Sequence, residues 1–109
     1  MQLEIYRFSL TVIGELAGLA RRIGRQDRGL SDQLRRAAQS VALNLAEGEC
    51  AVGGNRRMRF DSSMNSAKES VACLEVAVAM GYLPQADIDA SANGLGRIIA
   101  TVTKLNRRG

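Results

Sequence analysis

The 109-residue sequence has no histidine, no tryptophan, one proline and two cysteines. Without histidine, the chain cannot form the common His/Cys zinc sites, a Ser–His–Asp triad or a histidine acid–base step. The two cysteines, Cys50 and Cys73, do not form a metal-ligand cluster. We therefore expect no cofactor, no metal site and no catalytic residue. The cysteines are predicted to be reduced thiols of a cytoplasmic protein.

Long hydrophobic runs are also missing from the sequence. The apolar runs are far shorter than the roughly 18 residues that a membrane-spanning helix needs. The start of the sequence lacks the charged, apolar and cleavage regions of a signal peptide. We therefore expect a protein that has no membrane partner.

Small aliphatic side chains are abundant. Apolar residues make up 46% of the chain and aromatic residues only 4%, so the core must be built from Ala, Leu, Val, Ile and Met. Such side chains suit closely packed helices, and no alternating apolar run is long enough to predict a strand. At this length we expect a single domain over residues 1–109.

Residues 34–48 are apolar on nearly every side of a helix. Between positions 37 and 46, the polar residues are Gln39, Ser40 and Asn44. A helix that is apolar nearly all round is normally buried by its neighbours. We therefore expect this segment to be the central helix of a small bundle.

Apolar residues recur at a spacing of three to four in four segments, which predicts four helices. These segments are residues 3–24, 31–47, 56–80 and 85–106. The first segment carries two adjacent apolar lines, which indicates contact with more than one partner surface. Short links join the segments, so the sequence predicts an all-α fold, an antiparallel up-down-up-down four-helix bundle.

The predicted helix ends depend on capping residues. Ser31 and Asn55 are predicted to be the N-caps of the second and third helices. Gly48 is predicted to be the C-cap of the second helix. Gly81 is predicted to end the third helix, and the proline that follows separates it from the fourth.

Positive charge is concentrated in the first half of the chain. The net charge is +4, and 13 of the 15 basic residues are arginine. Residues 1–59 hold 10 basic and 6 acidic residues, whereas residues 60–109 hold 5 of each. The basic residues form three groups: Arg21, Arg22, Arg25 and Arg28; Arg35 and Arg36; and Arg56, Arg57 and Arg59.

In an antiparallel bundle the first two arginine groups share one end, and the third lies at the opposite end. The guanidinium group suits phosphates and carboxylates, so these groups are candidate sites for nucleic acid or another anionic partner. A solvated, ion-paired surface explains the same charge equally well. No aromatic side chains alternate with the arginines, so any nucleic-acid contacts are expected to be with phosphates and to depend on salt.

Polar side chains also recur on the second and third predicted helices. Facing helices could join them into a hydrogen-bond network that fixes the register of the bundle. The alternative is a catalytic pocket, which is disfavoured because the chain has no histidine, no paired carboxylates on one helix face and no activated nucleophile. The predicted network consists of Ser40, Asn44, Glu47, Ser66 and Ser70.

Three stretches resemble a bacterial family of four-helix-bundle proteins: residues 33–49, the region of Phe60 and residues 67–70, and residues 74–83. Members of this family are encoded within intervening sequences of ribosomal RNA genes, and the accessory variability proteins of diversity-generating retroelements are similar to them. The pattern Ser40, Asn44, Glu47, Gly48 is the most specific part. The chain departs from the family pattern at Glu69, which replaces a glycine, and at Cys73, which replaces a glutamate.

The resemblance implies an antiparallel bundle that assembles into a homopentamer and is not an enzyme. In the retroelement branch it also implies a basic surface that binds RNA and a reverse transcriptase. The leading hypothesis is therefore a homo-oligomeric bundle that binds RNA or a nucleoprotein partner through its arginines. The alternative is a protein–protein adaptor that has an acidic partner and no nucleic-acid role.

Overall fold

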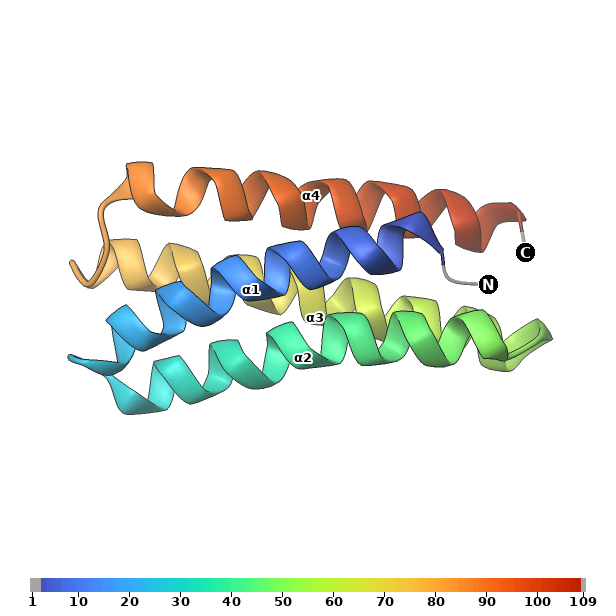
Figure 1. Ribbon diagram of the computed structural model, residues 1–109, viewed down its shortest axis with the longest axis horizontal. Helices are drawn as coiled ribbons and strands as arrows, with labels where there is room; N and C mark the ends of the chain where they lie inside the picture. Colours follow the sequence, from blue (N-terminus) through green and yellow to red (C-terminus); the bar gives the residue numbers. More distant parts are fainter. Residues whose placement is uncertain (1–2, 109) are drawn as a thin grey trace.

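The computed structural model describes residues 3–108. Its four helices are α1 (Glu4–Gly24), α2 (Arg28–Cys50), α3 (Gly53–Ala79) and α4 (Gln85–Arg108). Consecutive helices run antiparallel to each other along a molecule of 42 × 22 × 20 Å (Figure 1). The prediction of an all-α four-helix bundle is confirmed. No helix among the described residues is long and apolar enough to cross a membrane.

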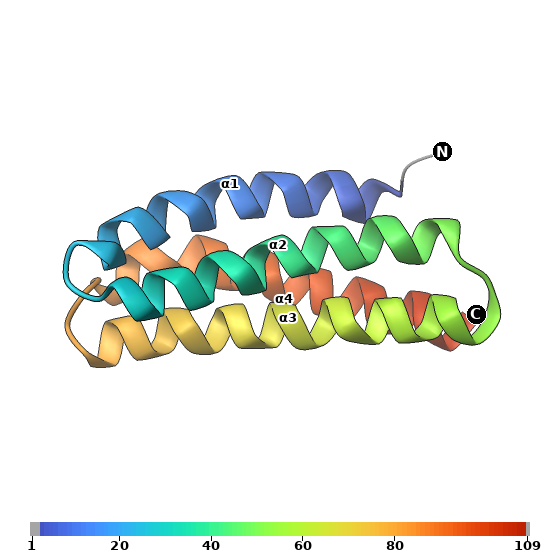
Figure 2. The same cartoon turned by 90° about the horizontal axis from the view of Figure 1, so that it is seen from below.

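Each helix packs against the helices that precede and follow it in the sequence, and α4 returns to α1 (Figure 2). Connections α1–α2 and α3–α4 lie at one end of the bundle, and the α2–α3 connection lies at the other end, beside the start of α1 and the end of α4. The end of α1 and the start of α2 therefore share one end.

The core is mainly aliphatic and contains one fully buried aromatic ring. The side chains of Phe60, Leu16, Leu34, Leu45 and Leu74 are fully buried. The expectation that α2 is buried on all sides is wrong for the single chain, because the Leu43 side chain is 61% exposed. α2 occupies one corner of the bundle, so its outward face is left without a covering helix.

α2 begins three residues before the predicted start. The carboxylate of Asp27 accepts a hydrogen bond of 2.9 Å from the backbone N–H of Leu30, so Asp27 is the N-cap. The prediction of Ser31 as the N-cap is wrong. Ser31 is buried, and its hydroxyl donates to the carbonyl oxygen of Ala20 at 2.7 Å, which ties α2 to α1.

Gly48 does not end α2, which continues to Cys50. Gly48 is buried, and a Cβ added there would lie 2.5 Å from Cε1 of Phe60. The glycine is therefore needed for the close approach of α2 and the Phe60 ring. The prediction of Asn55 as the cap of α3 is also wrong, because α3 already begins at Gly53. Gly81 does follow the end of α3, with a positive φ of 79°.

A tyrosine–carboxylate hydrogen bond links the two connections at one end. The hydroxyl of Tyr82 donates to Asp27 at 3.0 Å. This hydrogen bond, with smaller contributions from burial and from the negative charge of Asp27, raises the pKa of Tyr82. The folded protein therefore favours the protonated phenol more strongly than the unfolded chain does.

We expect this interaction to stabilise the protein below the ordinary tyrosine pKa of about 10 and to be lost as the pH rises through the higher pKa of the folded state. Urea denaturation at about pH 8 and about pH 11 measures the loss. In Tyr82→Phe the decrease between the two pH values should be smaller than in the wild type. An equal decrease in both proteins would contradict the prediction.

Candidate nucleic-acid interface

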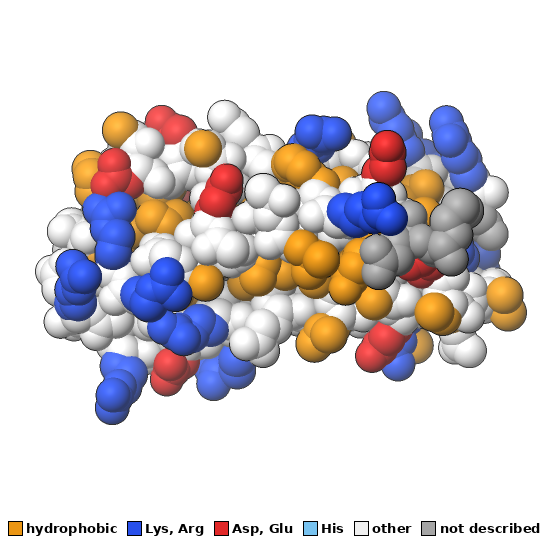
Figure 3. Space-filling view, in the orientation of Figure 1, with side chains coloured by type: hydrophobic (Ala, Val, Ile, Leu, Met, Phe, Trp, Pro, Cys, Tyr) orange, Lys and Arg blue, Asp and Glu red, His pale blue; other side chains and the backbone are white. Residues whose placement is uncertain are grey.

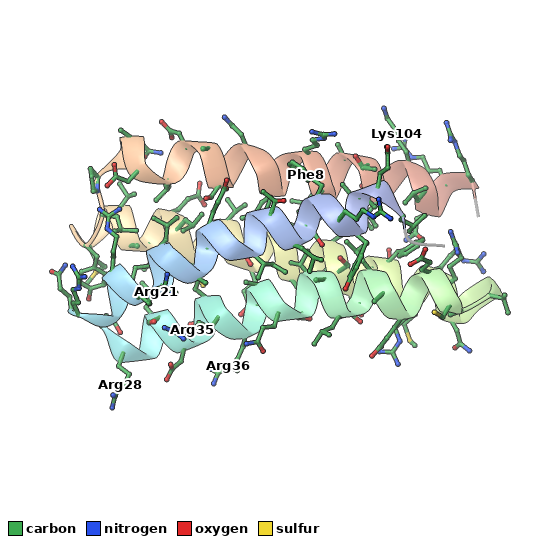
Figure 4. The ribbon with its side chains drawn as sticks, viewed as in Figure 1. Phe8, Arg21, Arg28, Arg35, Arg36 and Lys104 are labelled. Atoms are coloured by element: carbon green, nitrogen blue, oxygen red, sulfur yellow. The ribbon has the colours of Figure 1, made fainter. Side chains whose placement is uncertain are left out.

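Arginines from α1 and α2 gather at the end of the bundle where α1 ends and α2 begins. Arg21, Arg28, Arg35 and Arg36 all lie there (Figure 4). In the space-filling view, basic side chains cluster at this end, and an apolar band lies farther along between α1 and α2 (Figure 3). We call Arg21, Arg25, Arg28, Arg35 and Arg36 the basic end.

A depression of about 350 Å³ lies between α1 and α2 at the basic end. Arg28 and Arg35 are seven residues apart, so they share a face of α2 about 10 Å apart along the helix axis. Arg21 approaches from α1. The lining residues are Arg21, Gly24, Arg28, Ser31, Asp32 and Arg35.

The arginines of this depression are not paired with a carboxylate among the described residues. Within residues 3–108, neither Arg21, Arg28 nor Arg35 makes an ion pair or a hydrogen bond. Their side chains are exposed. Like charges held close together raise the electrostatic energy of the folded chain, and a bound anion lowers it.

The remaining arginines of the first two groups lie around this depression. Arg22 forms an ion pair with Asp87 of α4. Arg25 is exposed immediately after α1. Arg36 lies farther along α2, where it lines a second depression of about 290 Å³ with Ser40, Asn44 and Arg59. The first two arginine groups therefore share one end, as the antiparallel arrangement predicts.

Two arginines of the third group interact with other side chains or backbone groups of the chain. Arg56 lies over the ring of Phe60 at 4.8 Å and donates to the carbonyl oxygen of Gly48 at 3.4 Å. Arg59 pairs with Glu47 at 2.7 Å. Arg57 is exposed. Arg56 and Arg57 lie near the α2–α3 connection, at the opposite end of the bundle from the basic end. Arg59 lines the second depression together with Arg36, and there it is paired with Glu47. The prediction that the third group is separate from the first two is therefore wrong for Arg59.

Three of the predicted network residues meet between α2 and α3. Asn44 donates from Nδ2 to the hydroxyl oxygen of Ser40 at 2.9 Å, and the Ser66 hydroxyl donates to the same oxygen at 2.7 Å. The Ser70 hydroxyl donates to the carbonyl oxygen of Ser66 at 2.9 Å. Contrary to the prediction, Glu47 lies outside this network and pairs with Arg59 on the surface.

An apolar groove of about 340 Å³ runs between α1 and α2, beyond the basic end. The Leu10 side chain is 48% exposed and that of Leu43 is 61% exposed. The two adjacent apolar lines of α1 indicated contact with more than one partner surface, whereas the contribution of α2 to this groove was not predicted. The groove is lined by Tyr6, Leu10, Ile13, Gln39, Ala42 and Leu43.

Three lining residues of the basic depression, Gly24, Ser31 and Asp32, were not predicted to belong to a site. Gly24 and Ser31 lie close together, since a Cβ added at Gly24 would lie 3.2 Å from the Ser31 hydroxyl oxygen. Asp32 borders it because it lies between Arg28 and Arg35 on the same side of α2. The spacing of Asp32 from both arginines was the available signal, because residues three and four apart are neighbours on a helix.

The side chains that could serve as metal ligands are dispersed. Within the described part of the chain, no three His, Cys, Asp or Glu residues lie close enough together to hold a metal ion. Cys50 is exposed and Cys73 is buried, and both are free thiols. Burial, with a smaller effect from Glu69, raises the pKa of Cys73, so its reactive thiolate form is disfavoured.

The model of one protein family, described as 23S rRNA-intervening sequence protein, matches residues 1–104. The chain belongs to this family. A crystal structure of a protein of unknown function from Bacteroides thetaiotaomicron, assigned to the S23 ribosomal protein family, has the same fold. It superposes with a TM-score of 0.88, with 17% sequence identity over 94% of this chain and 95% of that one. No curated protein matches the chain. The family description names no catalytic activity.

Proposed function

We propose that the protein is a non-enzymatic, homo-oligomeric bundle that binds RNA, alone or in a nucleoprotein complex, through the basic end. The observation that carries this proposal is the group of unpaired arginines around the α1–α2 depression. An ion-paired surface would hold these side chains against carboxylates, as Arg22 and Arg59 are held. Membership in a family named for ribosomal RNA supports RNA as the anionic partner. The two free thiols fit a cytoplasmic protein.

Contacts with RNA phosphates would account for the exposed side chains of the basic end, which are arginines and not aromatic residues. A guanidinium group presents paired N–H donors that match two phosphate oxygens. The sugar–phosphate backbone has the same charge in every sequence, so such contacts give affinity and position rather than base specificity. A reverse transcriptase bound to the same RNA is the protein partner that the family resemblance suggests.

Fluorescence anisotropy with a labelled structured RNA tests the proposal. We expect binding at low salt that weakens steeply as salt is added, because bound arginines release counterions. Replacing Arg35 and Arg36 with Ala should weaken binding about tenfold to a hundredfold, since each charged hydrogen bond contributes about 1.5–3 kcal/mol in part-buried settings and less when exposed.

The matched control removes two positive charges elsewhere, in Lys68→Ala combined with Lys104→Ala, both exposed residues outside the basic end. Circular dichroism verifies that both variants fold. Absence of binding at low salt, or binding that ignores added salt, would overturn the proposal. Equal weakening by the two variants would show that the total charge matters and the basic end does not.

The oligomeric state is the second part of the proposal. The exposed apolar groove around Leu10 and Leu43 is a surface that a second copy could cover, and the family resemblance suggests a pentamer. We expect light scattering to give five times the chain mass of 11.7 kDa. Leu43→Glu should lower that mass, and Met80→Glu, at another exposed apolar residue, should leave it unchanged. A wild-type monomer would exclude assembly.

An adaptor that binds an acidic protein is the alternative function. The observation that favours it is that the apolar groove and the basic end both lie along α1 and α2 on one face of the molecule (Figure 3). A partner helix with apolar and acidic residues would match both. A partner that is retained after nuclease treatment, together with no RNA affinity of the pure protein, would support the adaptor.

A further inference from the structure

The geometry points to a ribonucleotide site in the α1–α2 depression, where Arg21, Arg28 and Arg35 bind phosphate oxygens and Asp32 accepts a hydrogen bond from a ribose 2′-hydroxyl. This inference rests on the proposed RNA binding and assigns its chemistry to one place. Such a site selects the ribose rather than the base.

Phosphate binding at this site follows from the arrangement of the three arginines. Arg28 and Arg35 lie on one face of α2, and Arg21 faces them from α1 across the same depression. The backbone N–H of Leu30 is already bonded to Asp27, so this donor at the start of α2 is occupied. The guanidinium groups of the three arginines, by contrast, remain unpaired within residues 3–108 and can donate to phosphate oxygens.

The preference of the site for RNA over DNA depends on Asp32. This residue lies four positions after Arg28 and three before Arg35, the spacings at which ion pairs usually form on a helix. Nevertheless, the structure shows no hydrogen bond or ion pair of Asp32 with any residue from 3 to 108. Its carboxylate lines an otherwise basic depression and forms no ion pair with the arginines beside it.

An ionised carboxylate has only acceptor oxygens. Beside a phosphate it repels the ligand, unless the ligand offers a donor at the same place. In an RNA strand the nearest donor to the backbone phosphates is the ribose 2′-hydroxyl, the group by which proteins distinguish RNA from DNA. A DNA strand would bring its phosphates to the arginines and leave Asp32 facing them with no hydrogen bond. Asp32 therefore penalises DNA and favours RNA.

The test compares three strands of the same sequence: RNA, 2′-fluoro RNA and DNA. The 2′-fluoro strand keeps the sugar shape of RNA and lacks the hydroxyl donor. We expect the wild type to bind RNA about tenfold more tightly than either other strand, since one hydrogen bond to a charged group is lost. In Asp32→Ala, the three strands should bind with about equal affinity, and the affinity for DNA should not decrease. Asp32→Asn, which keeps an acceptor oxygen, should retain part of the preference.

Two further variants separate this site from a general change in charge. Glu75→Ala removes an exposed carboxylate from α3 and should leave the preference for RNA intact. Arg28→Gln should weaken the binding of all three strands by the same factor, about threefold to tenfold, because phosphates are common to them.

A preference for RNA that survives Asp32→Ala, or a wild type that binds all three strands equally, would overturn the inference and leave the proposed RNA binding in place. Arg28→Gln with unchanged affinity would likewise overturn it alone. If no strand binds at low salt, the proposed function fails and the site fails with it. The two failures are therefore distinguishable in one set of titrations.

Discussion

Replacing Phe60 with Ala should lower the free energy of unfolding by about 3–5 kcal/mol, the range for deleting a buried aromatic ring. Phe60 has no exposed surface and is the largest fully buried side chain of the core. It lies on α3 and packs against α2 at Gly48. Its neighbours are held in regular helices and cannot collapse fully into the space left by the ring, so a cavity remains.

Urea denaturation followed by circular dichroism measures this loss as a lower midpoint at an unchanged slope. All variants are compared at one protein concentration, since assembly would make stability depend on it. Met58→Ala is the control, because Met58 lies on the same helix with a 53% exposed side chain and should change stability by less than about 0.5 kcal/mol. A loss below about 1 kcal/mol for Phe60→Ala would contradict the tight packing of the ring between α2 and α3.

Adding one methyl group at Gly48 should also destabilise the protein. In Gly48→Ala the new Cβ would lie 2.5 Å from Cε1 and 2.6 Å from Cδ1 of Phe60, so the ring or the helix must move. We expect a loss of about 1–3 kcal/mol, the usual range for overpacking a core. Alanine favours a helix interior by about 1 kcal/mol over glycine, so a loss would show that the steric effect outweighs helix propensity.

Gly14→Ala is the matched control for helix propensity. Gly14 lies inside α1, and a Cβ there meets no atom within 4 Å, so this variant should be stabilised by up to about 1 kcal/mol. In the background of Phe60→Leu, the penalty of Gly48→Ala should shrink, because the smaller side chain leaves space. A double-mutant cycle measures that coupling. Equal effects at Gly14 and Gly48 would exclude a close approach at Gly48.

The four helices could be predicted because their apolar residues recur with the helix period and few residues break the pattern. The ends of α2 and α3 were predicted less well. Ser31, Gly48 and Asn55 have the chemistry of caps, yet each lies within a helix. Ser31 and Gly48 are instead used in contacts between helices, with Ala20 and with Phe60. Residue type alone does not distinguish a cap from a small residue at a helix crossing.

The basic end could be predicted in outline, because antiparallel helices necessarily bring the end of one beside the start of the next. Which arginines remain unpaired could not be predicted. Arg22 and Arg59 belong to the same sequence groups as their neighbours but are paired with Asp87 and Glu47. Which arginine remains unpaired depends on which carboxylate a second helix places within reach, and only Arg21, Arg28 and Arg35 line the depression.

The sequence by itself determined the helical class, the number of helices, their order and the concentration of positive charge in the first half. These properties follow from local periodicity and from composition, which need no knowledge of the distant contacts of the chain. The tertiary structure decided where α2 begins and ends, which arginines are left without a carboxylate, and which apolar side chains remain exposed. Those properties depend on contacts between residues far apart in the sequence, because burial and charge pairing are set by the neighbouring helix.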